Sequence, residues 1–230
     1  MSYTYEHPRP SVAVDLVVLT IVDSELKVLL IRRGEPPFEG ERALPGGFLR
    51  TEPEPGEDLE QAAQRELQEE TGLPPGAVFL DQLGAFGRAD RDPRTRVISV
   101  AWYALVRPTL APFVKAGGDA AGVEWAAVEG TQGLAFDHDA ILAAAVRRVR
   151  EDLERRPLAF ELVPETFTIG ELRHVFDVIH GQAEDKGNFR RRFLRMVDEG
   201  LLEQASGQRR TGRRPARVYR FVGAQRAPRR

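Results

Sequence analysis

The stretch GEDLEQAAQRELQEETGL, residues 56–73, predicts the element around which the first part of the chain is built. Its apolar side chains recur every four residues and form one stripe of an amphipathic helix that begins near Asp58. This stripe consists of Leu59, Ala63 and Leu67. Gly72 follows at a position where glycine commonly ends a helix. We therefore expect this helix to pack through one face and to leave its acidic side chains on another.

The acidic side chains of this helix are spaced so that they converge. Glu66, Glu69 and Glu70 stand at positions i, i+3 and i+4, which share one helix face. Like charges this close repel each other unless a hard divalent cation lies among them, and oxygen ligands suit Mg²⁺ or Mn²⁺. Such an ion could bridge a pyrophosphate and orient a water molecule, with a free carboxylate as general base. A solvated acidic face is the alternative interpretation.

The segments around the helix predict an α+β fold. Before it, β-branched runs at 12–22 and 26–31 flank a turn at 23–24 and predict a hairpin. After it comes a long loop at 88–96, between two of the three further strands that we expect. These three strands are predicted at 78–83, 97–105 and 123–128.

The rest of the chain has the element order of a winged helix-turn-helix. Pro157 ends an alanine-rich helix that starts near Asp137, and the domain boundary is predicted there, between domains 1–156 and 157–230. Thr168 and Glu171 have the spacing of a capping box. The elements expected after the boundary are a short extended piece at 160–163, helices at 168–179 and 186–199, and strands at 201–203 and 218–222.

Charge is divided unevenly along the chain. Residues 181–230 hold 14 Lys and Arg against 5 Asp and Glu, a net charge of +9, whereas residues 1–180 hold 19 against 30, a net charge of −11. This division predicts a polyanion as partner of the C-terminal part. No stretch approaches the roughly 18 apolar residues of a membrane span, and there is no cysteine for disulfides or thiolate metal sites, so we expect a cytoplasmic protein without membrane contact.

The second helix of the C-terminal domain has the pattern of a DNA recognition helix. If Phe189, Phe193 and Met196 are buried, the polar side chains between them turn outward on one stripe. The candidate base-reading residues are Asn188, Arg191 and Arg195, with Arg192 at the edge of the stripe. Lys186 and Arg190 are candidates for phosphate contacts near the helix start.

The hairpin SGQRRTGRRPAR, residues 206–217, is the predicted wing. Its candidate DNA-contacting residues are Arg209, Arg210, Thr211, Arg213 and Arg214. A dimerisation module with solvated arginines is the alternative. RNA is a lesser alternative, because the wing has no interleaved aromatic residues on which bases could stack.

The helix and the loop before it resemble the Nudix box, whose pattern is G, five residues, E, seven residues, REUxEExGU, with U aliphatic. Glu57 precedes Arg65 by eight positions, and residues 65–73 fill the remainder. The family spacing places glycine at Thr51, whereas here Gly47 precedes the box, so the loop is four residues longer.

The resemblance implies an α/β/α Nudix sandwich and a substrate in which a nucleoside diphosphate is linked to another group. It implies Glu66, Glu69 and Glu70 as metal ligands, and these three with Glu57 as the candidate catalytic residues. Gly47 would be a backbone ligand and Arg65 a structural partner of a box carboxylate. Three arginines near strand ends beside the box are candidates for binding the ligand phosphates, namely Arg32, Arg33 and Arg50.

The chain from about Ser11 to Phe221 is similar to the Nudix-related transcriptional regulators, NrtR. The similarity rests on the Nudix box and on four further runs, FDHDAIL (136–142), FELVPETFTIGELRHVFDVI (160–179), DKGNFRRRFLRM (185–196) and GRRPARVYRF (212–221). It implies a homodimeric repressor of NAD-metabolism genes that binds a palindromic double-stranded operator and is released by ADP-ribose or a related nucleotide. A Mg²⁺-dependent ADP-ribose pyrophosphatase with an auxiliary winged helix is the alternative, and an RNA-directed Nudix hydrolase is a third hypothesis. Many members of that family no longer hydrolyse, and the retained glutamates leave the enzymatic activity open.

Overall fold

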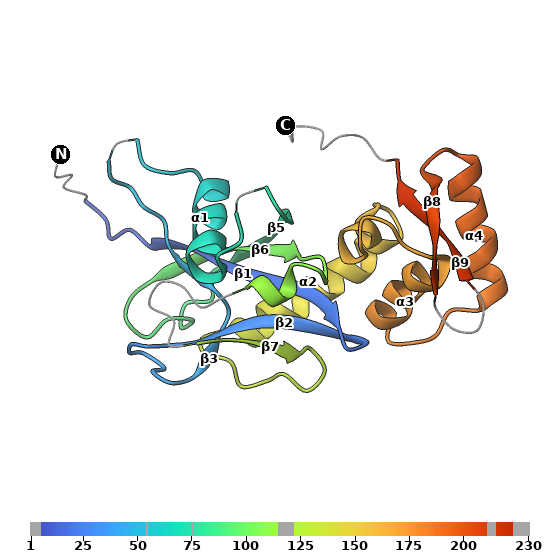
Figure 1. Ribbon diagram of the computed structural model, residues 1–230. Helices are drawn as coiled ribbons and strands as arrows, with labels where there is room; N and C mark the ends of the chain where they lie inside the picture. The colour runs from blue at the N-terminus through green and yellow to red at the C-terminus, as the bar shows by residue number, and fades with distance from the viewer. Residues whose placement is uncertain (1–5, 54, 75, 115–121, 211–214, 223–230) are drawn as a thin grey trace.

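The computed structural model describes residues 6–53, 55–74, 76–114, 122–210 and 215–222. They form two lobes that lie end to end (Figure 1). The first lobe holds a mixed sheet with a helix on each face, and the second holds two helices and a two-stranded sheet. Within the described residues no helix is both long enough and apolar enough to cross a membrane.

The sheet of the first lobe is organised around β1 (Ser11–Val22). The strand order is β3-β2-β1-β6-β5, with β4 paired to β1 and β7 paired to β2. β1 and β6 run parallel, and the other pairs are antiparallel. The remaining strands are β2 (Glu25–Arg32), β3 (Arg42–Ala43), β4 (Gly46–Phe48), β5 (Phe79–Phe86), β6 (Val97–Leu105) and β7 (Val123–Ala127).

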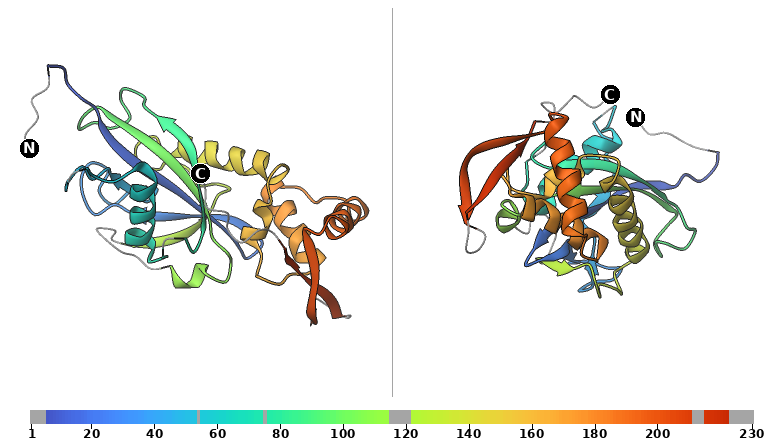
Figure 2. Two further views of the ribbon diagram at one scale, coloured as in Figure 1. Left: turned by 90° about the horizontal axis from the view of Figure 1, so that it is seen from above. Right: turned by 90° about the vertical axis from the view of Figure 1, so that its right-hand side faces the viewer.

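A helix covers each face of this sheet, which explains why β1 is apolar almost throughout. Successive side chains of a strand point to opposite faces, so Val14 and Leu16 pack under α1 (Leu59–Thr71), whereas Val17 and Leu19 pack under α2 (His138–Leu153). Figure 2 shows the two helices on opposite sides of the strands. The predicted α/β/α sandwich is confirmed.

The second lobe is the predicted winged helix. Its helices are α3 (Ile169–His180) and α4 (Lys186–Asp198), and its wing is the antiparallel pair β8 (Leu202–Arg210) and β9 (Pro215–Phe221). The capping box is present, because Thr168 accepts a hydrogen bond from Glu171 N and donates its own backbone N–H to the Glu171 carboxylate. Phe189 and Phe193 are buried as expected, and Met196 packs partly buried beside them.

Two predictions about this lobe are corrected. Of the segment 160–163, only Val163 is extended, because η2 (Leu158–Leu162) is a 3-10 helix that turns Leu158, Ala159 and Leu162 into the core. The wing strands are longer than expected and run up to Arg210 and from Pro215, because ladder hydrogen bonds between the two backbones do not require apolar side chains. In the first lobe, three short elements were not predicted: the 3-10 turn η1 (Ala111–Phe113) and the strands β3 and β4.

Candidate functional site

The loop before α1 lies directly against the first glutamate of the box. A Cβ added at Gly47 would lie 2.1 Å from Glu66 Oε1, so a larger residue here would displace the Glu66 carboxylate. Gly46 is similarly close to β1, because its added Cβ would lie 2.3 Å from the Val14 carbonyl oxygen. The four extra residues of the loop therefore do not separate Gly47 from the helix.

Arg65 organises the carboxylates of the box. Its guanidinium donates to Glu57 at 2.6 and 2.9 Å, to Glu66 at 2.6 Å and to Glu69 at 3.0 Å. The hydrogen bonds from Arg65 lower the pKa of Glu57. Burial raises the pKa of Glu66 although Arg65 opposes this shift. The structural pairing predicted for Arg65 is present.

The side chains of the box do not form a metal site as they lie. Glu69 is held from both sides, since Arg50 Nη2 lies 3.1 Å from its Oε1 and Arg65 Nη1 lies 3.0 Å from its Oε2. Glu66 and Glu70 are 6% and 8% exposed, whereas Glu69 stands in solvent. Throughout the described part of the chain, no three acidic or histidine side chains converge in a group that could hold a metal ion. The cations that neutralise Glu57, Glu66 and Glu69 here are the guanidinium groups of Arg50 and Arg65.

A cavity of about 170 Å³ opens beside Gly46 and Gly47. Its wall combines arginines and phenylalanines with two carboxylates and several aliphatic side chains. The arginines and phenylalanines are Arg33, Phe48, Arg91, Arg94 and Phe136, and the carboxylates are Asp15 and Asp92, of which Asp92 pairs with Arg94 at 2.8 Å. Arg33 and Phe48 flank the box in sequence, whereas Arg91 and Arg94 come from the long loop before β6 and Phe136 precedes α2.

Guanidinium groups and aromatic rings alternate in this wall. The Arg94 Cζ lies 5.5 Å from the Phe48 ring centroid and 5.9 Å from that of Phe136, and the Arg33 Cζ lies 4.8 Å from the Phe136 ring. Phe136 has φ of +58°, a backbone conformation that costs free energy and that clusters at ligand sites. Arginines suit phosphate and aromatic rings suit a planar base, so the wall has the chemistry of a nucleotide site.

A buried charge network closes the inner end of the cavity. Arg91, which is 5% exposed, donates to Asp15 at 2.9 Å and to Asp137 at 2.7 and 3.1 Å. His138 Nδ1 accepts from Leu44 N, and its Nε2 lies 3.4 Å from Asp15 Oδ1. Burial alone would raise the pKa of Asp15, but its interactions with His138 and Arg91 outweigh burial and lower the pKa to about 2. Asp137 is the N-cap residue as predicted, but its carboxylate binds Arg91 rather than the helix backbone.

The three arginines predicted for phosphate binding end in different places. Arg33 lines the cavity, and its guanidinium also donates to Pro37 O at 2.7 Å. Arg32 donates to Gly40 O at 2.7 Å, and Arg50 is paired with Glu69. Neither Arg32 nor Arg50 lines this cavity.

Several residues of the cavity were missed by sequence reasoning. They are Asp15, Phe48, Arg91, Arg94, Phe136 and His138. The dense charge of the loop RADRDPRTR, residues 88–96, was an available signal, since a long loop rich in arginine between two core strands is unusual unless it has a function.

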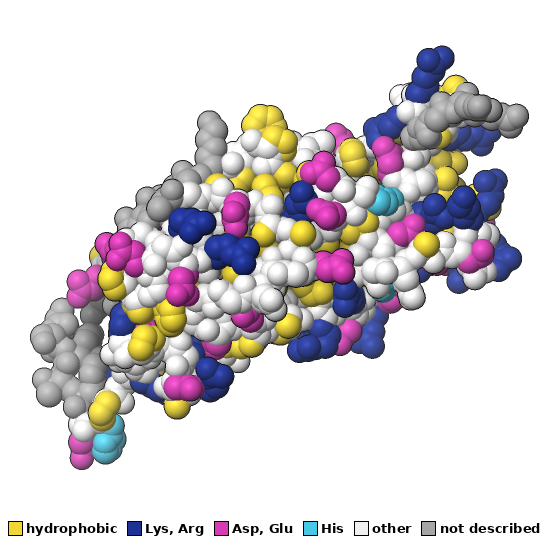
Figure 3. Space-filling view, turned by 90° about the horizontal axis from the view of Figure 1, so that it is seen from below, with side chains coloured by type: hydrophobic (Ala, Val, Ile, Leu, Met, Phe, Trp, Pro, Cys, Tyr) yellow, Lys and Arg dark blue, Asp and Glu magenta, His cyan; other side chains and the backbone are white. Residues whose placement is uncertain are grey.

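The predicted recognition face of α4 is open to solvent. Asn188, Arg191 and Arg195 are exposed, and the Arg191 guanidinium donates to the Asn188 side chain. Lys186 and Arg190 are exposed as well. Figure 3 shows Lys and Arg side chains gathered at the end of the molecule that the winged helix forms. This end presents hydrogen-bond donors and positive charge together.

Two of the predicted DNA-contacting arginines are engaged inside the protein. Arg192 pairs with Glu154 at 3.2 Å and with Glu184 at 2.6 Å. Arg209 pairs with Glu171 at 2.7 Å. Arg210 at the end of β8 is exposed, whereas the predicted contacts at 211, 213 and 214 lie outside the described residues.

Comparison with known proteins matches each lobe to a protein family. The NUDIX domain family matches residues 11–142, and the NrtR DNA-binding winged helix domain matches residues 159–221. A protein of Acinetobacter baylyi named "ADPR responsive transcriptional repressor NtrR" is 32% identical over 94% of this chain and 84% of its own length. The chain belongs to the NrtR family of Nudix regulators.

Two further matches accompany this NrtR-family assignment. The crystal structure of Shewanella oneidensis NrtR complexed with a 27mer DNA superposes with a TM-score of 0.74 at 31% identity, covering 91% of this chain and 93% of that one. An ADP-ribose pyrophosphatase of Methanocaldococcus jannaschii is 41% identical over 60% of this chain and 75% of its own length. In this NrtR-family chain, the residues between the two matched regions, 143–158, form most of α2 and the turn that follows it.

Proposed function

We propose that this chain is a transcriptional repressor that binds double-stranded operator DNA through its winged helix and releases it when ADP-ribose or a related nucleotide occupies the Nudix-domain cavity. The observation that carries this proposal is the presence, in one chain, of a cavity with arginine and phenylalanine side chains in its wall and of a helix, α4, whose Asn188, Arg191 and Arg195 are exposed. The name of the Acinetobacter relative and the DNA complex of the Shewanella relative support it.

DNA binding is supported by the chemistry of α4. Arg191 and Arg195 present guanidinium groups that suit guanine edges in the major groove, and Asn188 suits an adenine edge. Lys186 and Arg190 lie near the start of the helix, where phosphate contacts fix its orientation. Binding is therefore expected to weaken steeply as salt increases.

Ligand binding is supported by the cavity. A pyrophosphate would find the guanidinium groups of Arg33 and Arg94 at the wall and that of Arg91 at the inner end. A planar base would find the rings of Phe48 and Phe136. ADP-ribose contains both groups, which fits the names of the Acinetobacter and Methanocaldococcus relatives.

We propose that the protein is a homodimer, because winged helices that read palindromic sites do so as two-fold pairs. We propose that it acts in the cytoplasm on genes of NAD metabolism, and that its domain boundary lies at Pro157, where the connecting helix has ended.

A second candidate function is hydrolysis of ADP-ribose, with Mg²⁺ or Mn²⁺ as the metal. The observation in its favour is that Glu57, Glu66, Glu69 and Glu70 are all retained and that Gly47 abuts Glu66. Metal binding would require Glu69 to exchange its arginine partners, so this activity is secondary to binding in our proposal.

The proposal is tested by a mobility-shift titration. A duplex that the protein selects from a random pool is bound, and ADP-ribose is then added at fixed salt. We expect release, with a coupling of about 5- to 150-fold in DNA affinity. AMP serves as the matched ligand, since it has the base but lacks the diphosphate. DNA binding that does not respond to ADP-ribose contradicts the sensor, and absent DNA binding contradicts the whole proposal. AMP release from ADP-ribose with Mg²⁺ is measured separately.

A further inference from the structure

We propose that Glu154 is a positioning residue that couples the nucleotide cavity to the recognition helix. This inference rests on the function proposed above and names the contact through which that regulation acts. Glu154 is the C-cap residue of α2. Its Oε1 lies 3.0 Å from His180 Nε2 and its Oε2 lies 3.2 Å from Arg192 Nη1. One carboxylate at the end of the first lobe thus contacts both helices of the winged helix.

Arg192 connects Glu154 to the rest of the winged helix. Its Nη2 donates to Glu184 at 2.6 Å, in the turn between α3 and α4. Its Cζ lies 4.1 Å from the ring centroid of Phe176 on α3 and 5.0 Å from that of Phe189 on α4. Both helices thereby fix the guanidinium. A shift of Glu154 therefore acts on α4 through Arg192 and not through the exposed side chains of Asn188, Arg191 and Arg195.

A second contact from α2 reaches the same region. Arg150 Nε donates to the carbonyl of Ile179, in the last turn of α3, at 2.8 Å. Arg150 and Glu154 are four residues apart and therefore lie on one face of α2. The last turns of α2 hold the end of α3 and the inner side of α4 together.

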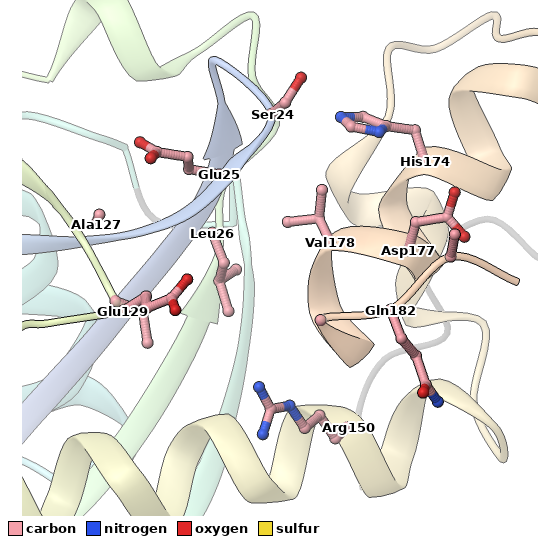
Figure 4. A pocket seen from close by; sticks show the side chains of 13 residues that line it. Ser24, Glu25, Leu26, Ala127, Glu129, Arg150, His174, Asp177, Val178 and Gln182 are labelled. Atoms are coloured by element: carbon pink, nitrogen blue, oxygen red, sulfur yellow. The ribbon is translucent and has the colours of Figure 1, made fainter.

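A cleft lies between the two lobes beside these contacts. This cleft, of about 600 Å³, separates the β1–β2 hairpin from α3, with Leu26 and Glu129 on one side and His174 and Val178 on the other. Figure 4 shows Arg150 rising from α2 at the base of this cleft. Because one wall belongs to each lobe, a rotation of the winged helix about the end of α2 opens or narrows the cleft.

The N-terminal end of α2 lies at the cavity. Asp137 and His138 are joined there to Arg91 and Asp15, as described above. A ligand phosphate in the cavity competes with Asp137 for Arg91. The ligand can shift the equilibrium between two arrangements of the lobes only if it binds one of them more tightly, and this competition provides that difference. The helix has 16 residues and spans roughly 24 Å, so a displacement of its first turn reaches Glu154 through a rigid element.

The test compares two alanine variants of the full-length protein. Glu154→Ala removes the proposed contact, and Glu151→Ala removes an exposed carboxylate from the same end of α2 as a matched control. Three quantities are measured for each: the Kd for ADP-ribose, the Kd for a pool-selected duplex, and that DNA Kd at saturating ADP-ribose. In Glu154→Ala we expect the Kd for ADP-ribose and the Kd for the duplex to change by less than about threefold. The factor by which ADP-ribose raises the DNA Kd should become at least about fivefold smaller than in the wild type. Glu151→Ala should retain the wild-type response.

An unchanged ligand response in Glu154→Ala overturns the inference, as does an equal fall in Glu151→Ala. Complete loss of DNA binding by a folded Glu154→Ala protein also overturns it, because Glu154 would then be needed for docking itself. These results require that ADP-ribose releases DNA from the wild type. If it does not, the proposed function fails first, and the two failures are thereby distinguished.

Discussion

Replacing Asp15 by asparagine tests the buried network at the inner end of the cavity. Asp15 is 7% exposed, accepts from Arg91 at 2.9 Å and lies beside His138. Its pKa in the folded protein is about 2, against an ordinary value of 3.8. That difference corresponds to about 2 kcal/mol of folding stability at neutral pH, which Asp15→Asn should remove.

The pH dependence of this loss has a definite sign. Because folding lowers the pKa of Asp15, its contribution is fully present above 3.8 and is lost as the pH falls towards 2. Urea denaturation of the wild type and the variant should therefore give a constant difference in the free energy of unfolding between roughly pH 7 and pH 5. Below about pH 4 the two proteins should converge.

Asp90→Asn is the control for this experiment. Asp90 lies on the same loop as Arg91, but its side chain is 74% exposed, so we expect a change below about 0.5 kcal/mol. A loss in Asp15→Asn below about 0.5 kcal/mol at pH 7 would refute the reasoning. A difference that grows on acidification would refute it too.

Four other substitutions test the remaining parts of the site. Arg191→Ala and Arg195→Ala should each weaken DNA binding by about 1–3 kcal/mol, measured by fluorescence anisotropy, and unchanged affinity would show that the recognition face is misplaced. Arg50→Ala should raise Mn²⁺ affinity about two- to fivefold, measured by electron paramagnetic resonance, because it removes a cation from a box carboxylate; an equal or lower affinity contradicts this. Gly46→Ala should lower the free energy of unfolding by about 1–3 kcal/mol, measured by thermal denaturation, because its Cβ would meet the backbone carbonyl oxygen of Val14; wild-type stability would contradict that contact.

Arg147→Ala is the matched control for the two recognition-helix variants. Arg147 is an exposed arginine on α2, away from α4, and its loss changes net charge by the same amount. We expect DNA affinity to fall by less than about 0.5 kcal/mol in this variant. Equal losses in all three variants would mean that general charge, and not the α4 stripe, is responsible.

Local patterns were sufficient for most of the fold. The stripe of α1, the capping box at Thr168 and the buried pair Phe189 and Phe193 were all predicted and are all present. Each depends on residues within one or two turns of each other, whose relative positions the helix geometry fixes. The segment 160–163 was predicted wrongly, because a short apolar run fits a buried strand and a buried turn equally well.

The sequence by itself determined which faces are buried, where helices begin and end, and that an acidic lobe precedes a basic one. Only the tertiary structure decided the charge partners: Arg91 with Asp15 and Asp137, which are 76 and 46 positions away, and Arg192 with Glu154, 38 positions away. Periodicity encodes the direction in which a side chain points from its own element. An ion pair depends on the distance between elements, and one acidic residue is chemically like another until the fold brings a particular one within reach.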